Sequence, residues 1–272
     1  MSLRAALTPQ RHTRSVTVGI DFSFAAAAPS SPVTALTISY PDGLDIELGE
    51  LGLDTCSIAR IEAVGPRGCP ANSIMGYGRA LAEVQVGPEV LHETAQVTLA
   101  RARQHDGRFT VLLDAEGTEP LIARVLMIGE LLPAQPPFGG ALRFSVPTVA
   151  SVPGGPDIAL VRLDLVLGPP NLVYHERLHG KTIAYHPKGI TLLGACPRAG
   201  RPFSATARFL DGRSASADTT VRCRAARALP AALWHTPVGR ASASRSAWLC
   251  AVDSRADAVA AYPDLGVVAA HR

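Results

Sequence analysis

Short stretches in which apolar and polar residues alternate recur along most of this chain, and they constrain its fold more than any other feature. The clearest is 16–24, where valine, isoleucine and phenylalanine alternate with threonine, glycine, aspartate and serine. A period of two is typical of a β-strand with one buried face. Similar stretches lie at 33–40, 80–86, 95–100, 109–114, 121–132, 142–149, 158–167, 172–185, 203–210 and 216–221.

The segments between these stretches contain turn residues instead of long helical patterns. The Pro-Asp-Gly sequence at 41–43 predicts a turn, because proline fixes its φ angle and glycine tolerates a positive one. Asp211 and Gly212 predict a hairpin, and one short helical turn is expected at 58–64. Roughly ten short strands at this spacing predict an all-β fold, an antiparallel β-sandwich or jelly-roll-like domain.

The strand pattern predicts one β-sandwich domain over residues 16–224 of the 272. Residues 1–15 are polar and are expected to form a flexible N-terminus. Residues 225–272 are rich in alanine and arginine and are expected to form a weakly structured, low-complexity tail. No apolar run approaches the roughly 20 residues of a transmembrane helix. A net charge of +3 and an aromatic content of 5% predict no nucleic-acid partner.

Five cysteines bear on the compartment: Cys56, Cys69, Cys196, Cys223 and Cys250. Their spacing is interpreted as two local disulfides, Cys56–Cys69 and Cys196–Cys223, with Cys250 left over; the alternative is five reduced cysteines in a cytosolic protein. Disulfides would place the protein in an oxidising compartment, secreted or at the cell surface. No signal peptide is visible, because the basic N-terminal residues are not followed by an apolar run of the usual length.

Four segments resemble exported β-rich proteins of high-GC Gram-positive bacteria, a group without an established activity. They are the N-terminal Val-x-Val-x-Ile-x-Phe stretch, the sequence from Cys56 through Gly-Cys-Pro-Ala-Asn-Ser-Ile-Met-Gly-Tyr-Gly at 68–78, Tyr-His-Pro-Lys-Gly-Ile at 185–190, and Cys-Pro-x-x-Gly with Phe-x-Asp-Gly before Cys223. The resemblance covers about residues 16–224. It implies secretion, two disulfides and an all-β fold.

One sequence matches a catalytic motif. His175, Glu176 and His179 form the His-Glu-x-x-His pattern that binds zinc when it lies on a helix, with the glutamate activating water. Only eight residues separate Asn171 from Gly180, however, and on a strand the two histidines would lie about 13 Å apart. The segment is therefore interpreted as an exposed hairpin without metal or cofactor, and a zinc-dependent hydrolase is kept as the alternative.

Other polar residues receive structural interpretations. The Gly-Tyr-Gly sequence at 76–78 resembles a phosphate-binding loop but lacks a lysine, so its glycines are taken to allow close backbone approach within a strand. Asp114, Glu116 and Glu119 lie near Gly117 and are interpreted as turn residues and not as an acid–base pair.

The non-catalytic candidate for a functional surface consists of Lys181, Tyr185, His186 and Lys188, which could recognise an anionic glycan or a protein partner; the alternative is a solvated hairpin. The sequence thus predicts a non-enzymatic, exported or cell-surface structural or binding module. A carbohydrate-binding module acting through Tyr77, Tyr174 and Tyr185 is a further alternative, although the low aromatic content argues against a stacking surface.

Overall fold

A computed structural model describes residues 1–10, 15–24, 31–86, 89–119, 123–150, 157–195 and 197–222. Within these residues, eleven strands form one continuous sheet in which every pairing is antiparallel. Their spatial order is β1 (Ser2–Pro9), β2 (Val16–Ser23), β10 (Ala159–Leu167), β5 (Ile74–Val86), β6 (Glu89–Arg101), β7 (Thr110–Glu119), β8 (Arg124–Leu132), β9 (Phe138–Ser145), β3 (Val33–Pro41), β14 (Arg201–Phe209) and β15 (Ser214–Val221).

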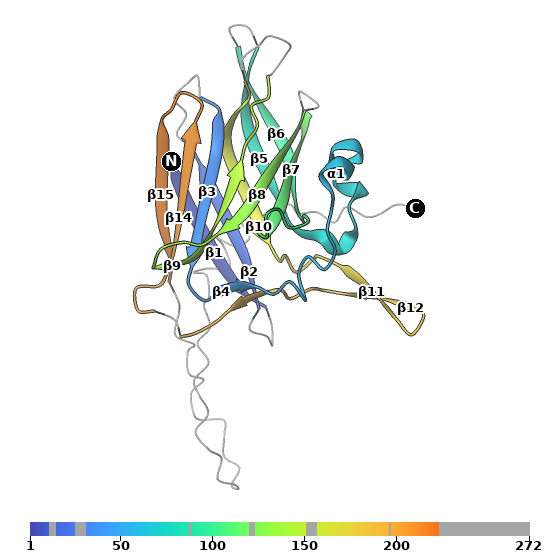
Figure 1. Ribbon diagram of the computed structural model, residues 1–272. Coiled ribbons are helices and arrows are strands. Elements are labelled where there is room, and N and C mark those ends of the chain that lie inside the picture. Colours follow the sequence, from blue (N-terminus) through green and yellow to red (C-terminus); the bar gives the residue numbers. More distant parts are fainter. Residues whose placement is uncertain are drawn as a thin grey trace, which may run out of the picture.

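Four short strands form two further pairs. β11 (Tyr174–Leu178) and β12 (Lys181–Tyr185) form a hairpin that projects from one end of the large sheet, and β4 (Leu44–Ile46) pairs with β13 (Ile190–Leu192) (Figure 1). The helix α1 (Ile58–Val64) and the 3-10 turns η1 (Pro66–Gly68) and η2 (Ala71–Ser73) lie outside the sheet.

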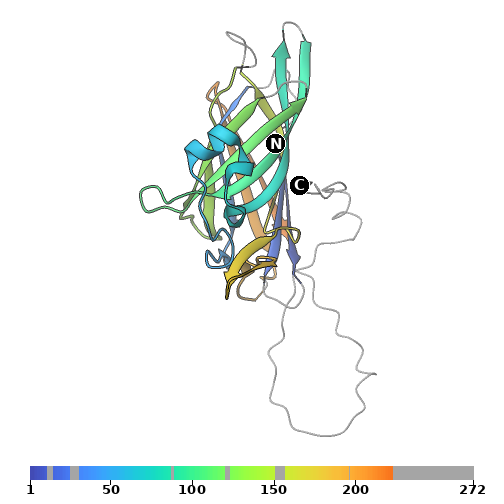
Figure 2. The ribbon, with the colours of Figure 1, turned by 90° about the vertical axis from the view of Figure 1, so that its right-hand side faces the viewer.

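The large sheet curls until it is nearly barrel-shaped, with its two outer strands, β1 and β15, in contact (Figures 1 and 2). Alternate residues of each strand point into the enclosed space and bury their apolar side chains there. Phe22, Leu36, Leu113, Phe144 and Leu163 are among the buried core residues. The prediction of an all-β antiparallel fold is confirmed.

The N-terminal segment differs from the prediction. Residues 1–15 are expected from the sequence to be flexible, but Ser2–Pro9 forms β1 and pairs with β2 along its whole length. Leu3 and Leu7 are buried and Ala5 packs against the core, so this strand too has a period of two. Two leucines in a polar stretch are a weak signal for a strand. β1 is stabilised by its pairing with β2, which the local sequence does not reveal. The tail at 225–272 lies outside the described residues.

Several local predictions are confirmed. The turn at Asp211 and Gly212 joins β14 to β15, and Gly212 has a φ of 84°. The helical turn expected at 58–64 is α1, where the Ser57 hydroxyl accepts a hydrogen bond from the Arg60 backbone N–H at 3.3 Å.

The glycines at 76 and 78 do allow a close approach of two strands. Both lie in β5, opposite β10. A Cβ atom at Gly76 would overlap the carbonyl oxygen of Val166, and one at Gly78 would overlap that of Asp164. Glycine is therefore required here by space, which explains the motif without a bound phosphate.

Candidate functional site

Among the described residues, two hollows lie in the interior of the sheet, one toward each end of the strands. The first, called the apolar hollow, is partly open to solvent and has a cavity volume of about 60 Å³. It is lined by Val18, Ile20, Ile38, Tyr40, Leu44, Ile46, Met75, Leu99, Phe109, Val111, Leu131, Leu142, Leu165, Leu167, Ile190 and Phe203.

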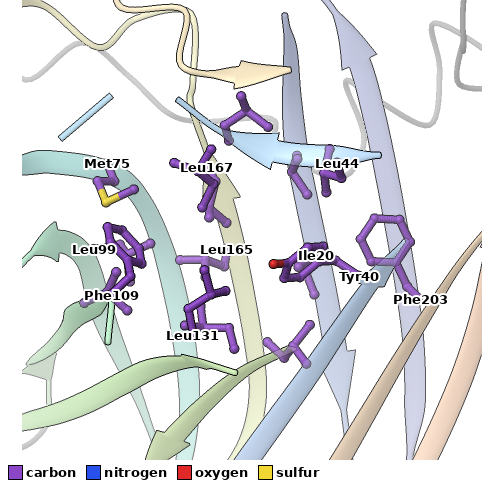
Figure 3. Close-up of a pocket in the computed structure, with 16 residues that line it drawn as sticks. Ile20, Tyr40, Leu44, Met75, Leu99, Phe109, Leu131, Leu165, Leu167 and Phe203 are labelled. Carbon is purple, nitrogen blue, oxygen red and sulfur yellow. The ribbon is translucent and has the colours of Figure 1, made fainter. Parts of the chain in front are cut away.

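The lining of the apolar hollow is almost entirely hydrocarbon. The Met75 sulfur and the Tyr40 hydroxyl are the side-chain heteroatoms among its residues (Figure 3). These side chains come from nine strands of the large sheet or the segments between them and from the small β4–β13 pair, and they point toward a shared space. Burial raises the pKa of the Tyr40 hydroxyl, with a smaller contribution from Asp45. Such a space suits a molecule that offers apolar surface and few polar groups.

The second hollow, called the Glu93 hollow, lies farther along the same strands. It too is partly open to solvent, and its cavity volume is about 80 Å³. It is lined by Val33, Ala80, Ala82, Glu93, Ala95, Ala115, Gly117, Ala123, Val125, Met127, Val146, Pro147, Val149, Ile158, Leu160 and Leu163. Small side chains predominate, and Glu93 is the one charged residue among them.

A layer of core side chains separates the two hollows. On β9, Leu142 lines the apolar hollow, Val146 follows the strand and lines the Glu93 hollow, and Phe144 lies between them. Phe144 is fully buried, and its ring occupies the space above Gly129, where a Cβ atom would lie 2.6 Å from the ring. The aromatic ring therefore belongs to the partition between the hollows.

The His-Glu-x-x-His sequence forms the predicted hairpin and not a helix. His175 and Glu176 lie on β11, whereas His179 lies in the turn before β12 with a φ of 50°. The His175 backbone makes two hydrogen bonds with the Asn72 side chain, at 2.8 and 2.9 Å. Within the described part of the chain, no group of three or more His, Cys, Asp or Glu side chains is placed to hold a metal ion.

The three tyrosines of the carbohydrate alternative differ in their exposure. Tyr174 is fully buried; its hydroxyl donates to the Ile74 carbonyl at 2.6 Å and accepts from the Gly52 N–H at 2.8 Å. Tyr185 packs edge-on against it at 6.0 Å between ring centroids, and Tyr77 is half-buried. Tyr174 therefore has no exposed ring face for a sugar.

The proposed recognition surface is spread along the hairpin and the loop after it. Lys181 begins β12 and Tyr185 ends it, so that the two lie about 13 Å apart at the usual rise per strand residue. His186 and Lys188 follow on the loop, both exposed, and His186 Nδ1 lies 2.9 Å from the Leu172 carbonyl. These four residues share one segment but do not form a compact cluster.

The described residues contain the first of the two predicted disulfides. Cys56 and Cys69 are bonded at an S–S distance of 1.99 Å and enclose α1 and η1. The Cys56 backbone N–H also donates to the Arg101 carbonyl at 2.7 Å, which attaches this segment to the end of β6. Cys196, Cys223 and Cys250 lie outside the described residues.

A second buried carboxylate lies on the outer face of the sheet. Asp114 is in the interior of β7, fully buried, and its Oδ1 lies 3.6 Å from Arg124 Nε. The same guanidinium contacts Glu116 at 2.9 Å and lies against Gly65, the residue that ends α1. Burial raises the pKa of Asp114 to about 6, against the opposing effect of Arg124. The interpretation of Asp114 and Glu116 as turn residues is wrong, since both lie within the strand.

Sequence reasoning did not single out Glu93, which is the most unusual polar residue of the interior. The signal was available in the strand pattern: residues 93, 95, 97 and 99 of β6 share one face, and three of them are alanine, valine and leucine. A glutamate in line with apolar residues marks either a strand end or a buried charge.

Comparison with known proteins finds no matching family model, no matching curated protein and no matching solved structure. Among the described residues, none of the helices has the length and apolar character needed to cross a bilayer. The class of protein is therefore defined by the fold alone. It is an all-β chain with two hollows inside one curled sheet.

Proposed function

We propose that this protein is a non-enzymatic, exported or cell-surface binding module that holds a small apolar molecule in the apolar hollow. The observation that carries the proposal is the hydrocarbon lining of that hollow, contributed by strands from all around the sheet. Transfer of apolar surface from water into such a space is favourable in proportion to the area buried, about 25 cal/mol per Å².

The rigidity of the surrounding sheet supports this function. A continuous antiparallel ladder fixes the positions of the lining side chains, so the space persists without a ligand and little ordering is needed on binding. Catalysis would require nucleophilic, acid–base or metal-binding groups around the ligand, and the lining offers the hydroxyl of Tyr40 and the thioether of Met75.

The test is titration of the protein with toluene, followed by isothermal calorimetry and by the midpoint of thermal unfolding. We expect saturable binding and a rise of the midpoint with toluene concentration. Leu131→Trp should abolish both effects, because Leu131 lines the apolar hollow and the larger ring would fill it.

Leu132→Trp is the matched control for this substitution. Leu132 is the next residue of β8 and points to the opposite face of the sheet, so its replacement adds the same bulk outside the apolar hollow. Wild-type affinity is expected for this variant. Equal toluene binding by the two tryptophan variants, or no saturable binding by the wild type, would contradict the proposal.

Export is supported by the Cys56–Cys69 disulfide, because such bonds persist in oxidising compartments. Fractionation of the source cells, followed by a non-reducing peptide map, should find the protein outside the cytosol with these two cysteines linked. Recovery in the cytosol with both thiols free would contradict this part of the proposal.

A further inference from the structure

We propose that the Glu93 hollow is a second binding site, and that it takes a small organic cation with one protonated primary amino group on an apolar body. This site is separate from the apolar hollow, so it goes beyond the function proposed above. Either site can exist without the other.

The Glu93 hollow contains a buried carboxylate without a partner among the described residues. Glu93 lies in the interior of β6 with its side chain 3% exposed, and neither Oε1 nor Oε2 has a hydrogen-bond partner among the described residues. A buried carboxylate without a partner is strongly unfavourable in its ionised form. Burial accordingly raises the pKa of Glu93. Such a carboxylate either destabilises the folded protein or forms a hydrogen-bonded ion pair once a ligand binds.

The walls of the Glu93 hollow consist mainly of small apolar residues. Ala82, Ala95, Ala115 and Ala123 and Gly117 surround the space with small apolar side chains, and no Lys, Arg or His of the described chain lines it. The lining therefore provides no cation of its own, and the small side chains leave room for an external one. Ala82 is the direct cross-strand neighbour of Glu93, which places open space beside the carboxylate.

The chemistry of the lining determines which ligand would be complementary to the Glu93 hollow. Glu93 offers two acceptor oxygens and a negative charge at one point, and the other described wall residues are apolar. The complementary molecule has several N–H donors and a positive charge at one end and hydrocarbon elsewhere, as a primary alkyl- or arylalkylammonium ion does. Hydrogen bonds between charged groups are stronger than those between neutral groups, and a site of low polarity strengthens them further than water does. The exposed Pro147 is part of the lining, so the space extends to the surface.

The experiment compares benzylamine with benzyl alcohol, its neutral counterpart of nearly the same shape, by isothermal titration calorimetry at pH 7.5. Wild-type protein should bind benzylamine at least about tenfold more tightly than benzyl alcohol, since the ammonium group gains the carboxylate. Glu93→Gln should weaken benzylamine binding by about the same factor and leave benzyl alcohol unchanged. The variant loses an unpaired buried charge, so its folding should not suffer.

The matched control is Glu83→Gln. Glu83 is a buried carboxylate on the neighbouring strand β5, but it faces His92 at 3.7 Å and does not line the Glu93 hollow. Benzylamine binding should be unchanged in this variant. A second variant, Ala82→Leu, fills the space beside Glu93 and should abolish binding while the carboxylate remains.

Four outcomes would overturn the proposal, and three of them concern the Glu93 hollow directly. They are no saturable benzylamine binding, equal affinity for the amine and the alcohol, and full benzylamine binding by both Glu93→Gln and Ala82→Leu. If Leu131→Trp lost benzylamine binding while Glu93→Gln kept it, the amine would bind in the apolar hollow. This outcome too would overturn the proposal. Toluene binding is measured separately, so its failure would affect the apolar hollow alone.

Discussion

At the scale of single residues, two of the buried acids, Glu93 and Asp114, have different surroundings. Glu93 points inward and has no charged partner among the residues described, whereas Asp114 points outward and is covered near the end of α1, with Arg124 at 3.6 Å. The Arg124 guanidinium contacts both the Asp114 and the Glu116 carboxylates. The attraction of Arg124 therefore does not offset the burial of Asp114, and the pKa of that carboxyl rises to about 6.

The raised pKa makes Asp114 a source of pH-dependent stability. The folded protein holds this proton more tightly than the unfolded chain, whose aspartates have a pKa near 3.8. The stabilising contribution is complete below about pH 4 and is lost as the pH rises to about 6. The free energy of unfolding of the wild type, minus that of Asp114→Asn, should fall by as much as about 3 kcal/mol across this interval. Urea unfolding from pH 3.5 to 7 measures it, and a constant difference would contradict the argument.

Sequence reasoning could not have found these two sites in full. The adjacent Gly117 favours a turn at Asp114 and Glu116, but β7 continues to Glu119. The burial of Asp114 involves a segment about fifty residues earlier in the chain, held by Cys56 and Cys69. No local pattern carries that information, whereas the inward position of Glu93 follows from the alternation along β6.

At the scale of elements, glycines decide where two strands can meet. Gly78 of β5 lies so close to β10 that a Cβ atom would overlap the Asp164 carbonyl oxygen. Gly78→Ala should therefore force the two strands apart and destabilise the protein by about 1–3 kcal/mol, the usual cost of overpacking.

Gly49→Ala is the matched control for Gly78→Ala. Among the described residues, no atom beyond the chain neighbours of Gly49 lies within 4 Å of the point that a Cβ atom would occupy there. The added methyl group should therefore change stability by less than about 0.5 kcal/mol. Urea unfolding of the two variants beside the wild type makes the comparison. Equal midpoints for Gly78→Ala and Gly49→Ala would show that β5 and β10 can separate without loss.

The elements themselves were largely predictable, because period-two patterns are local. The stretches at 16–24, 203–210 and 216–221 correspond to β2, β14 and β15, and the helical turn at 58–64 is α1. β1 was missed because its burial depends on Leu3 and Leu7 meeting a sheet that the rest of the chain builds.

At the scale of the whole molecule, closure of the sheet creates the interior that both proposals use. β1 and β15 come from opposite ends of the described chain, and their contact brings the outer strands together. Strand order of this kind depends on pairings between distant segments, such as β2 with β10 and β3 with β14. The sequence predicts strands and turns, but the pairing of distant strands, and with it the two hollows, is a property of the assembled sheet.

The partition formed by Phe144 would limit the length of the ligand proposed for each hollow. Phe144→Ala should cost about 3–5 kcal/mol of stability, since it removes a fully buried ring and leaves a cavity. It should also join the two hollows, because Phe144 lies between their linings on β9. Octylamine, anchored at Glu93, could then extend past position 144, so its affinity relative to that of benzylamine should rise in the variant.

Phe209→Ala is the control, because that half-buried ring packs against Phe24 and lines neither hollow. An unchanged ratio of the two amine affinities in Phe144→Ala would show that the ring does not separate the hollows.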